Sequence, residues 1–147
     1  MPVQANGLDR SPWNEAMNTA AMHKALAGSQ AGKLTFPEVV GMLIGAGVES
    51  YFADLLRGEE TFYTTDGETH REQMKLPPSK IAGEFSQPGL VAAIRAAQAD
   101  QIRYPEFVKQ ATAAGTIGYW AFLTGKKVIY FGRKGEFHIE EFPRQKS

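Results

Sequence analysis

The sequence has no cysteine, which excludes disulfides, thiolate metal sites, iron–sulfur clusters and cysteine nucleophiles. It has no excess charge, because 16 basic residues balance 16 acidic residues among 147. It also has no run near the roughly 20 apolar residues that a membrane-spanning helix needs. Its basic residues are interleaved with acids, so no cluster attracts phosphates. We therefore expect no nucleic-acid or membrane partner, and the cytoplasm is the default location.

Apolar side chains make up 43% of the residues and are spread along most of the chain, as in a folded domain. We expect one domain over residues 11–143, a disordered N-terminal tail over 1–10 and a C-terminal tail over 144–147. The first ten residues lack the apolar block of a secretory signal, and they contain no lipidation motif.

An internal repeat organises the chain. The segment FPEVVGMLIGAGVESYFAD (36–54) returns as YPEFVKQATAAGTIGYWAF (104–122), with seven of 19 positions identical at an offset of 68 residues. At the same offset, GETHRE (67–72) lies over GEFHIE (135–140). We expect repeat one over about 11–76, a Pro/Gly-rich linker over about 75–89 and repeat two over about 86–143.

Each copy predicts two helices followed by three strands. Thr35 and Glu38 form the pattern of a capping box, for which Glu106 is the second-copy acid, and Gly47 and Gly115 stand where helices stop. Aromatic and β-branched runs predict hairpin strands over 48–56 and 60–65, over 117–123 and 126–131, and a third strand after each hairpin. The predicted fold class is α+β, with two ααβββ repeats, pseudo-two-fold symmetry and helices packed on an antiparallel sheet.

These segments, together with the closing KVIYFGRKGEFHIEEFP, resemble the DUF1398 family of uncharacterised bacterial proteins. The likeness covers roughly residues 13–143. It implies a bacterial protein, in some cases phage-related, and it brings no catalytic residues with it.

The most specific polar pattern is Glu-x-His-x-Glu, which occurs twice. Residues two apart on a strand share a face, so each copy aligns a carboxylate, an imidazole and a carboxylate. One interpretation is a divalent metal site or a metal-dependent enzyme, in which the two histidines converge. The other is that the pattern is the solvent side of a half-buried strand whose opposite face carries Phe137 and Ile139. The metal candidates are Glu68, His70, Glu136 and His138, with Glu72 and Glu140 completing the pattern.

Aromatic residues load both faces of the first strand of each copy. One face carries Tyr51 and Tyr119, and the other carries Phe52 and Trp120. A sheet covered by helices on one side normally has a polar second face, so we expect something apolar to cover it. That cover is the other copy, a partner subunit or a bound apolar molecule.

The sequence thus favours a non-enzymatic domain that binds a protein or a small molecule through Tyr51, Phe52, Tyr119 and Trp120. We expect no catalytic residues and no cofactor, and the alternative is the divalent metal site. The candidate partners are a second copy of the chain, in a homodimer, or a host protein.

Overall fold

The computed structural model describes residues 12–76 and 80–143. Both predicted tails lie outside these residues, as does part of the predicted linker. The helices are α1 (Pro12–Gln30), α2 (Phe36–Gly45), α3 (Gln87–Gln98) and α4 (Tyr104–Ala113). The strands are β1 (Val48–Asp54), β2 (Glu59–Thr64), β3 (Thr69–Gln73), β4 (Thr116–Phe122), β5 (Lys127–Gly132) and β6 (Phe137–Glu141).

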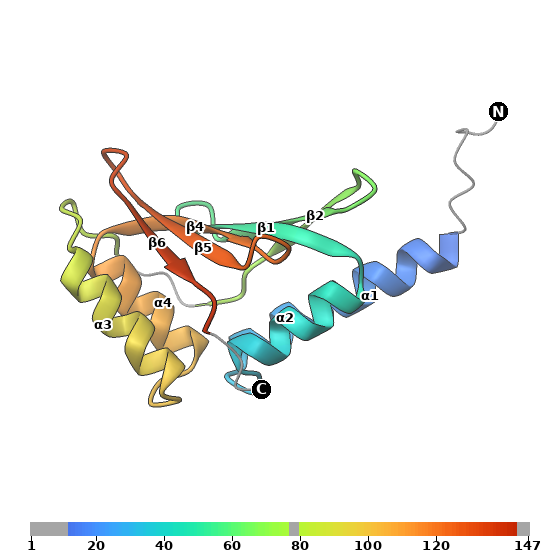
Figure 1. The fold of residues 1–147 in the computed structure, drawn as a ribbon, viewed down its shortest axis with the longest axis horizontal. Coiled ribbons are helices and arrows are strands. Elements are labelled where there is room, and N and C mark those ends of the chain that lie inside the picture. Colours follow the sequence, from blue (N-terminus) through green and yellow to red (C-terminus); the bar gives the residue numbers. More distant parts are fainter. Residues whose placement is uncertain (1–11, 77–79, 144–147) are drawn as a thin grey trace.

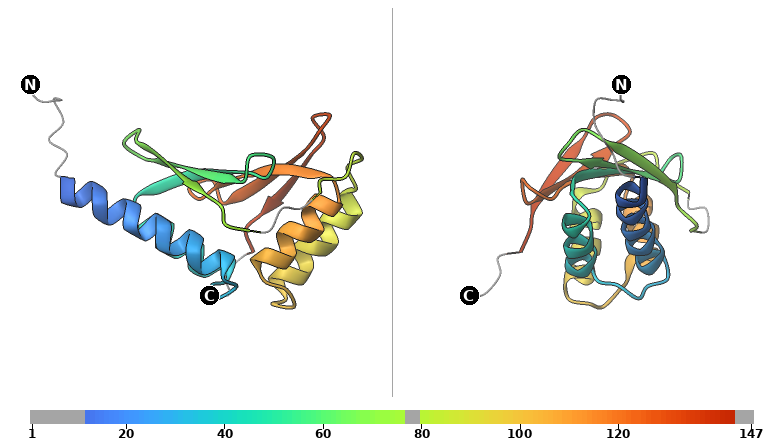
Figure 2. Two further views of the ribbon diagram at one scale, coloured as in Figure 1. Left: turned by 180° about the vertical axis from the view of Figure 1, so that it is seen from behind. Right: turned by 90° about the vertical axis from the view of Figure 1, so that its right-hand side faces the viewer.

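The six strands form one antiparallel sheet in the order β3-β2-β1-β4-β5-β6. Strands β1 and β4 pair at its centre, where Phe52 lies opposite Trp120. The helix pairs α1/α2 and α3/α4 lie beneath the sheet on the same side (Figure 1; Figure 2). The two pairs approach each other at the ends far from the sheet and spread apart toward it. The predicted α+β class, with helices on one side of an antiparallel sheet, is confirmed.

Local signals place the ends of the helices. Thr35 caps α2 by accepting from the amide of Glu38, whose carboxylate accepts from the amide of Thr35 at 2.8 Å, so this capping box is confirmed. The expected capping role of Glu106 is wrong: α4 has no side-chain cap hydrogen bond, because Arg103 has no side-chain oxygen to accept an amide, and the carboxylate of Glu106 accepts from Gln110 at 3.1 Å instead. Ser86 caps α3 through the amide of Gly89 at 3.1 Å.

Strand β1 ends two residues earlier than the sequence predicts. The carboxylate of Asp54 accepts from the amides of Leu56 and Arg57 at 3.1 and 3.0 Å. These bonds turn the chain into the hairpin and remove Leu55 and Leu56 from the strand.

The hydrophobic core lies between the sheet and the helices. It draws on both halves of the chain, with Leu43 and Phe62 from the first and Leu90 and Ala121 from the second among its members. Of the helices in the described part of the chain, none is both long enough and apolar enough to cross a membrane.

Candidate functional site

The four aromatic candidates from the sequence divide between the two faces of the sheet. Tyr51 and Tyr119 point toward the helices and are 3% and 4% exposed. Phe52 and Trp120 point to the other side and pack against each other, with ring centroids 5.3 Å apart. The residues therefore do not form one site, although each pair lies across the central β1–β4 junction.

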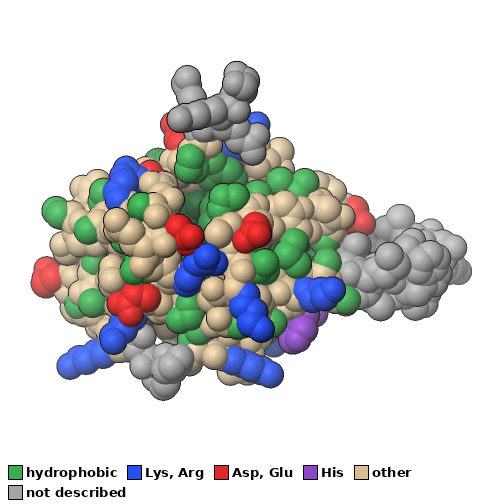
Figure 3. Space-filling view, turned by 90° about the horizontal axis from the view of Figure 1, so that it is seen from below, with side chains coloured by type: hydrophobic (Ala, Val, Ile, Leu, Met, Phe, Trp, Pro, Cys, Tyr) green, Lys and Arg blue, Asp and Glu red, His purple; other side chains and the backbone are tan. Residues whose placement is uncertain are grey.

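A cavity of about 330 Å³ lies under the centre of the sheet, between the two helix pairs. Seen from the helix side, hydrophobic side chains surround a hollow in this face (Figure 3). The lining comes from both halves and is mainly apolar, with Leu26, Leu34 and Phe36 from the first half and Ile94, Phe107 and Val128 from the second. A concave, mostly apolar space with a few polar groups is the usual form of a small-molecule site.

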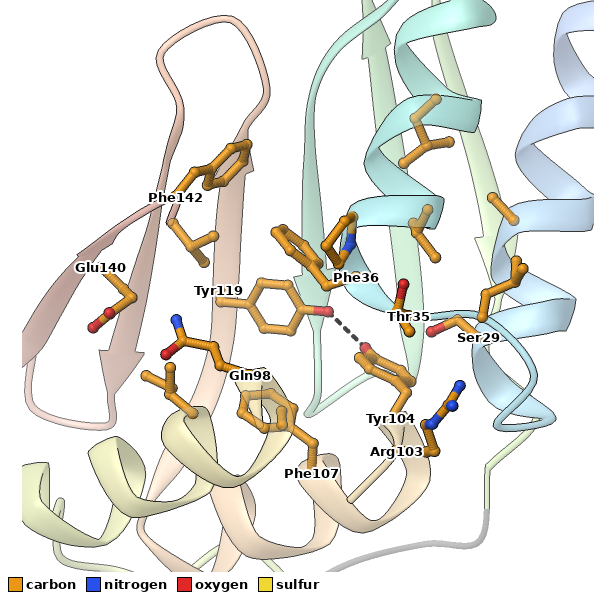
Figure 4. Close-up of a pocket in the computed structure, with 18 of the residues that line it drawn as sticks. Ser29, Thr35, Phe36, Gln98, Arg103, Tyr104, Phe107, Tyr119, Glu140 and Phe142 are labelled. Atoms are coloured by element: carbon orange, nitrogen blue, oxygen red, sulfur yellow. Dashed lines mark hydrogen bonds between the residues drawn. The ribbon is translucent and has the colours of Figure 1, made fainter. Parts of the chain in front are cut away.

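Polar groups meet at the inner end of this cavity. Tyr104, at the start of α4, and Tyr119, on β4, point toward each other with their hydroxyl oxygens 2.8 Å apart (Figure 4). The hydroxyl of Tyr104 also donates to the carboxylate of Glu60 on β2 at 3.2 Å. Glu60 is 5% exposed, and it lines the cavity together with Tyr51 and both of these tyrosines.

Burial controls the protonation of this cluster. It raises the pKa of Glu60 from 4.5 to about 7, although the hydrogen bond from Tyr104 acts in the opposite direction. Burial also raises the pKa values of Tyr51, Tyr104 and Tyr119 well above 10, and the nearby Glu60 charge raises each of them further. The tyrosines are therefore neutral hydrogen-bonding groups at physiological pH, whereas Glu60 is poised between its two forms.

The polar side of the Glu-x-His-x-Glu strands faces the helices and not the solvent. Phe137 and Ile139 are 62% and 46% exposed, whereas His138 and Glu140 are partly buried on the helix side. The reason is that α3 supplies polar partners: Gln87 bonds Nδ1 of His138 at 2.9 Å, and Arg95 donates to Glu140 at 2.6 Å. The interpretation that made Phe137 and Ile139 the buried face is wrong.

The corresponding residues of β3 have a similar arrangement. Glu72 bonds Nε2 of His70 at 2.6 Å and Nδ1 of His23 on α1 at 3.0 Å. Partial burial raises the pKa of Glu72, but the hydrogen bonds from both histidines outweigh this effect, and the net shift is downward. At Glu140, partial burial likewise raises the pKa, but the hydrogen bonds from Arg95 and His138 lower it by more, and the net shift is again downward.

The predicted convergence of the two histidines is wrong, because β3 and β6 form opposite edges of the sheet. Glu136 instead accepts from the amide of Lys134 at 2.9 Å, and Glu68 lies in the turn before β3, where its amide donates to Thr64. Within residues 12–76 and 80–143, no group of three or more histidine and acidic side chains could hold a metal ion.

Sequence reasoning missed Glu60, Tyr104 and Tyr130 as cavity residues. A signal for Glu60 was present, because period two along β2 puts it on the same face as the buried Phe62. A second signal is the repeat itself: at the offset of 68 residues, Val128 stands at the position of Glu60 and Phe36 at that of Tyr104. At each of these two pairs of positions, one half has a polar residue where the other half has an apolar one.

The side of the sheet away from the helices, here called the open face, carries an apolar cluster. Trp120 stacks with Tyr63 and with Phe122, both at centroid distances of 5.6 Å. Cross-strand pairs continue the cluster to the edge of the sheet. Its members are Phe52, Tyr63, Trp120, Phe122, Ile129, Phe131, Phe137 and Ile139.

Fold and cavity define an α+β protein with a six-stranded antiparallel sheet, helices on one side and a tyrosine-rich cavity between them. The chain belongs to the DUF1398 family, whose model, described as a protein of unknown function, matches residues 33–141. The matched residues include α2, α3, α4 and all six strands, but they do not include α1. No curated protein matches the sequence.

Proposed function

We propose that this protein binds a small organic molecule, without converting it, in the cavity between the helix pairs. The observation that carries the proposal is a mainly apolar space of about 330 Å³ with a buried carboxyl group and tyrosine hydroxyls at its inner end. Ligand pockets start at roughly 300 Å³ and combine apolar walls with few polar groups. Burying a carboxyl group costs free energy of folding, so a carboxyl group with a purely structural role would be more stable facing water.

Fluorescence of N-phenyl-1-naphthylamine, an uncharged probe that brightens in apolar surroundings, tests this proposal. We expect the wild-type protein to enhance its emission with saturation at one probe per chain. Ala97, on α3, lines the cavity, so Ala97→Phe fills part of the space and is expected to weaken probe binding.

Ala92→Phe is the matched control, because Ala92 is exposed on the same helix. It should leave probe binding unchanged. Equal binding by the wild type and both variants, with all three folded by circular dichroism, would mean that the probe binds elsewhere and would count against the cavity.

We also propose that the two halves are copies of one unit related by a pseudo-two-fold axis through Phe52 and Trp120. Both halves have two helices followed by three strands, and equivalent irregularities interrupt the pairing at Val48/Ser50 and Thr116/Gly118. The cavity then lies between the copies, and equivalent positions line it from both sides. This supports one ligand site per chain and not one per repeat.

A second candidate function is assembly of two copies of the chain through their open faces. The observation that favours it is the 62% and 46% exposure of Phe137 and Ile139, next to Ile129 and Phe131 on β5. A second copy is the partner that we propose, because the chain has zero net charge and two copies therefore meet without overall repulsion. Two sheets with apolar faces pack about 10 Å apart as a sandwich.

The cytoplasmic location, the bacterial or phage origin and a host protein partner stay predictions.

A further inference from the structure

The cavity holds one buried acidic group, Glu60, whose charge is not balanced by an ion pair. None of the ion pairs among the residues that the structure describes involves Glu60, and its carboxylate accepts a hydrogen bond from the neutral Tyr104. Two other carboxylates at the cavity have partners, because Asp100 pairs with Arg103 at 2.8 Å and Glu140 pairs with Arg95 at 2.6 Å. Glu141 also lines the cavity, but it is exposed to solvent. Where Glu60 is ionised, a bound molecule therefore meets a negative charge at the inner end.

Aromatic rings also line the cavity. Tyr119 packs against Tyr51 at a centroid distance of 6.1 Å and against Tyr130 at 5.4 Å. Phe107 lies 6.2 Å from Tyr130, and all four rings line the cavity. The faces of aromatic rings are electronegative and attract cations, most strongly where water is excluded.

We propose that the cavity binds an organic cation, an amine or quaternary ammonium compound with an apolar remainder, whose charged group lies against Glu60 and the tyrosine rings. This inference rests on the proposed function and adds the class of ligand. A cation supplies the positive charge that the buried carboxylate lacks, whereas an anion would meet an uncompensated negative charge. The rings can coordinate a methylated or alkylated ammonium group, which has few or no N–H donors.

The difference between the halves fixes the orientation of the ligand. Glu60 pairs across the sheet with Ala53 on β1, and its equivalent, Val128, pairs with Ala121 on β4. Likewise Tyr104 has the apolar Phe36 as its equivalent, across the cavity. One side of the cavity thus carries the unpaired Glu60 and the hydroxyl of Tyr104. The other carries Val128, Phe36 and the carboxylate of Glu140, whose charge Arg95 balances. The charged end of the ligand lies on the Glu60 side and its apolar end on the side of Val128 and Phe36.

The test uses two probes of nearly the same shape, the phenyltrimethylammonium cation and the neutral tert-butylbenzene, titrated into the full-length protein at pH 8 and followed by amide NMR shifts. We expect the wild-type protein to bind the cation about tenfold or more tightly than Glu60→Gln does. The neutral probe should bind both proteins within about threefold, because the amide keeps the shape of the cavity. Ala97→Phe should weaken both probes.

The outcomes separate this inference from the proposed function. If the neutral probe binds and the cation shows no preference for the wild type over Glu60→Gln, the cavity is a binding site but the cationic class is wrong. If neither probe binds the wild-type protein, both proposals fail.

A pH series provides a measurement on the wild-type protein itself. Three tyrosines face Glu60: Tyr51 on β1, Tyr104 on α4 and Tyr119 on β4. The residue opposite Glu60 on β3 is Glu72, which forms hydrogen bonds with His23 and His70. Because a proton competes with the cation for Glu60, affinity for phenyltrimethylammonium should fall at least about tenfold from pH 8 to pH 5. Glu60→Gln separates this effect from pH effects elsewhere in the protein, since it should show a much smaller change. An equal pH dependence in both proteins would overturn the assignment to Glu60.

Discussion

The carboxyl group of Glu60 is held in the interior at a cost in stability. Its pKa is about 7 in the folded protein, against 4.5 as the ordinary value, because burial disfavours the charged form. Below pH 4.5 the group is protonated in both states and there is no penalty. As the pH rises from 4.5 to 7, the unfolded state loses this proton before the folded state does, and its free energy falls relative to that of the folded state. The free energy of unfolding is therefore expected to fall through this window and to stay low above it.

Glu60→Gln should remove this loss. We expect the variant to gain about 2 to 3 kcal/mol relative to the wild type between pH 5 and pH 8, measured by urea unfolding at both values. Glu49→Gln, at an exposed position of β1, is the control and should show no comparable change. A Glu60→Gln difference that is the same at both pH values would show that this carboxyl group is not buried in its charged form.

Tyr104 links Glu60 to Tyr119 through a single hydroxyl group. Tyr104→Phe removes both hydrogen bonds and leaves the ring, so we expect a loss of about 1 to 2 kcal/mol in the free energy of unfolding at neutral pH. The same change at Tyr63, on the open face, is the matched control and should cost less. Since the Tyr104 bond lowers the pKa of Glu60 in the folded protein, the variant should also raise the upper limit of the pH window described above, whereas the lower limit stays at the ordinary pKa.

At the residue scale, the sequence predicted which side chains share a face of the sheet better than it predicted which groups pack against each face. Tyr51 and Tyr119 were correctly separated from Phe52 and Trp120, because alternation follows from strand geometry alone. Glu60 was missed because a charged residue is assigned by default to water. Only the tertiary structure brings Tyr104 from α4 to within hydrogen-bond distance of it.

At the element scale, the two helix-ending glycines provide a matched pair. Gly47 and Gly115 both have positive φ, 86° and 87°, as expected for helix stops. A Cβ at Gly47 would meet nothing within 4 Å, whereas one at Gly115 would lie 2.3 Å from the carbonyl oxygen of Glu84. The equivalent turns therefore differ in what packs against them.

We expect Gly47→Ala to cost about 1 to 2 kcal/mol, the strain of a left-handed alanine. Gly115→Ala should cost at least about 2 kcal/mol more, because the segment before α3 must also move. Thermal or urea unfolding of both variants measures the difference. Equal losses would contradict the close packing of Glu84 against the α4–β4 turn.

The edge strands show why element patterns alone did not fix the orientation of β3 and β6. The alternation of Phe137 and Ile139 with His138 and Glu140 is compatible with either face toward the core. Hydrophobicity favours burying the apolar side, but α3, which lies beneath the sheet, presents Gln87 and Arg95, and these residues bond to the polar side instead. Information of this kind lies in the pairing of distant segments and is absent from the strand itself.

At the scale of the whole molecule, the two sides of the sheet have different characters. The helix side encloses a cavity with a polar inner end, and the open face carries the exposed side chains of Phe137 and Ile139. The open face is also uneven: at the repeat offset, Thr69 and Arg71 on β3 stand where Phe137 and Ile139 stand on β6. The apolar area is therefore concentrated over β4, β5 and β6, which makes this half of the face the expected contact between two copies.

Sedimentation velocity tests this contact. We expect the wild-type protein to sediment as a dimer, and the double variant Phe137→Ser, Ile139→Ser to sediment as a monomer with little change in melting temperature, because both side chains are exposed. Arg71→Ser, at the polar edge of the same face, is the control and should remain dimeric. A monomeric wild-type protein, or a double variant that stays dimeric, would exclude this half of the face as the contact. Because the cavity opens on the helix side, probe binding there should be the same in the dimer and in the monomeric variant, so the two proposed functions can be tested independently.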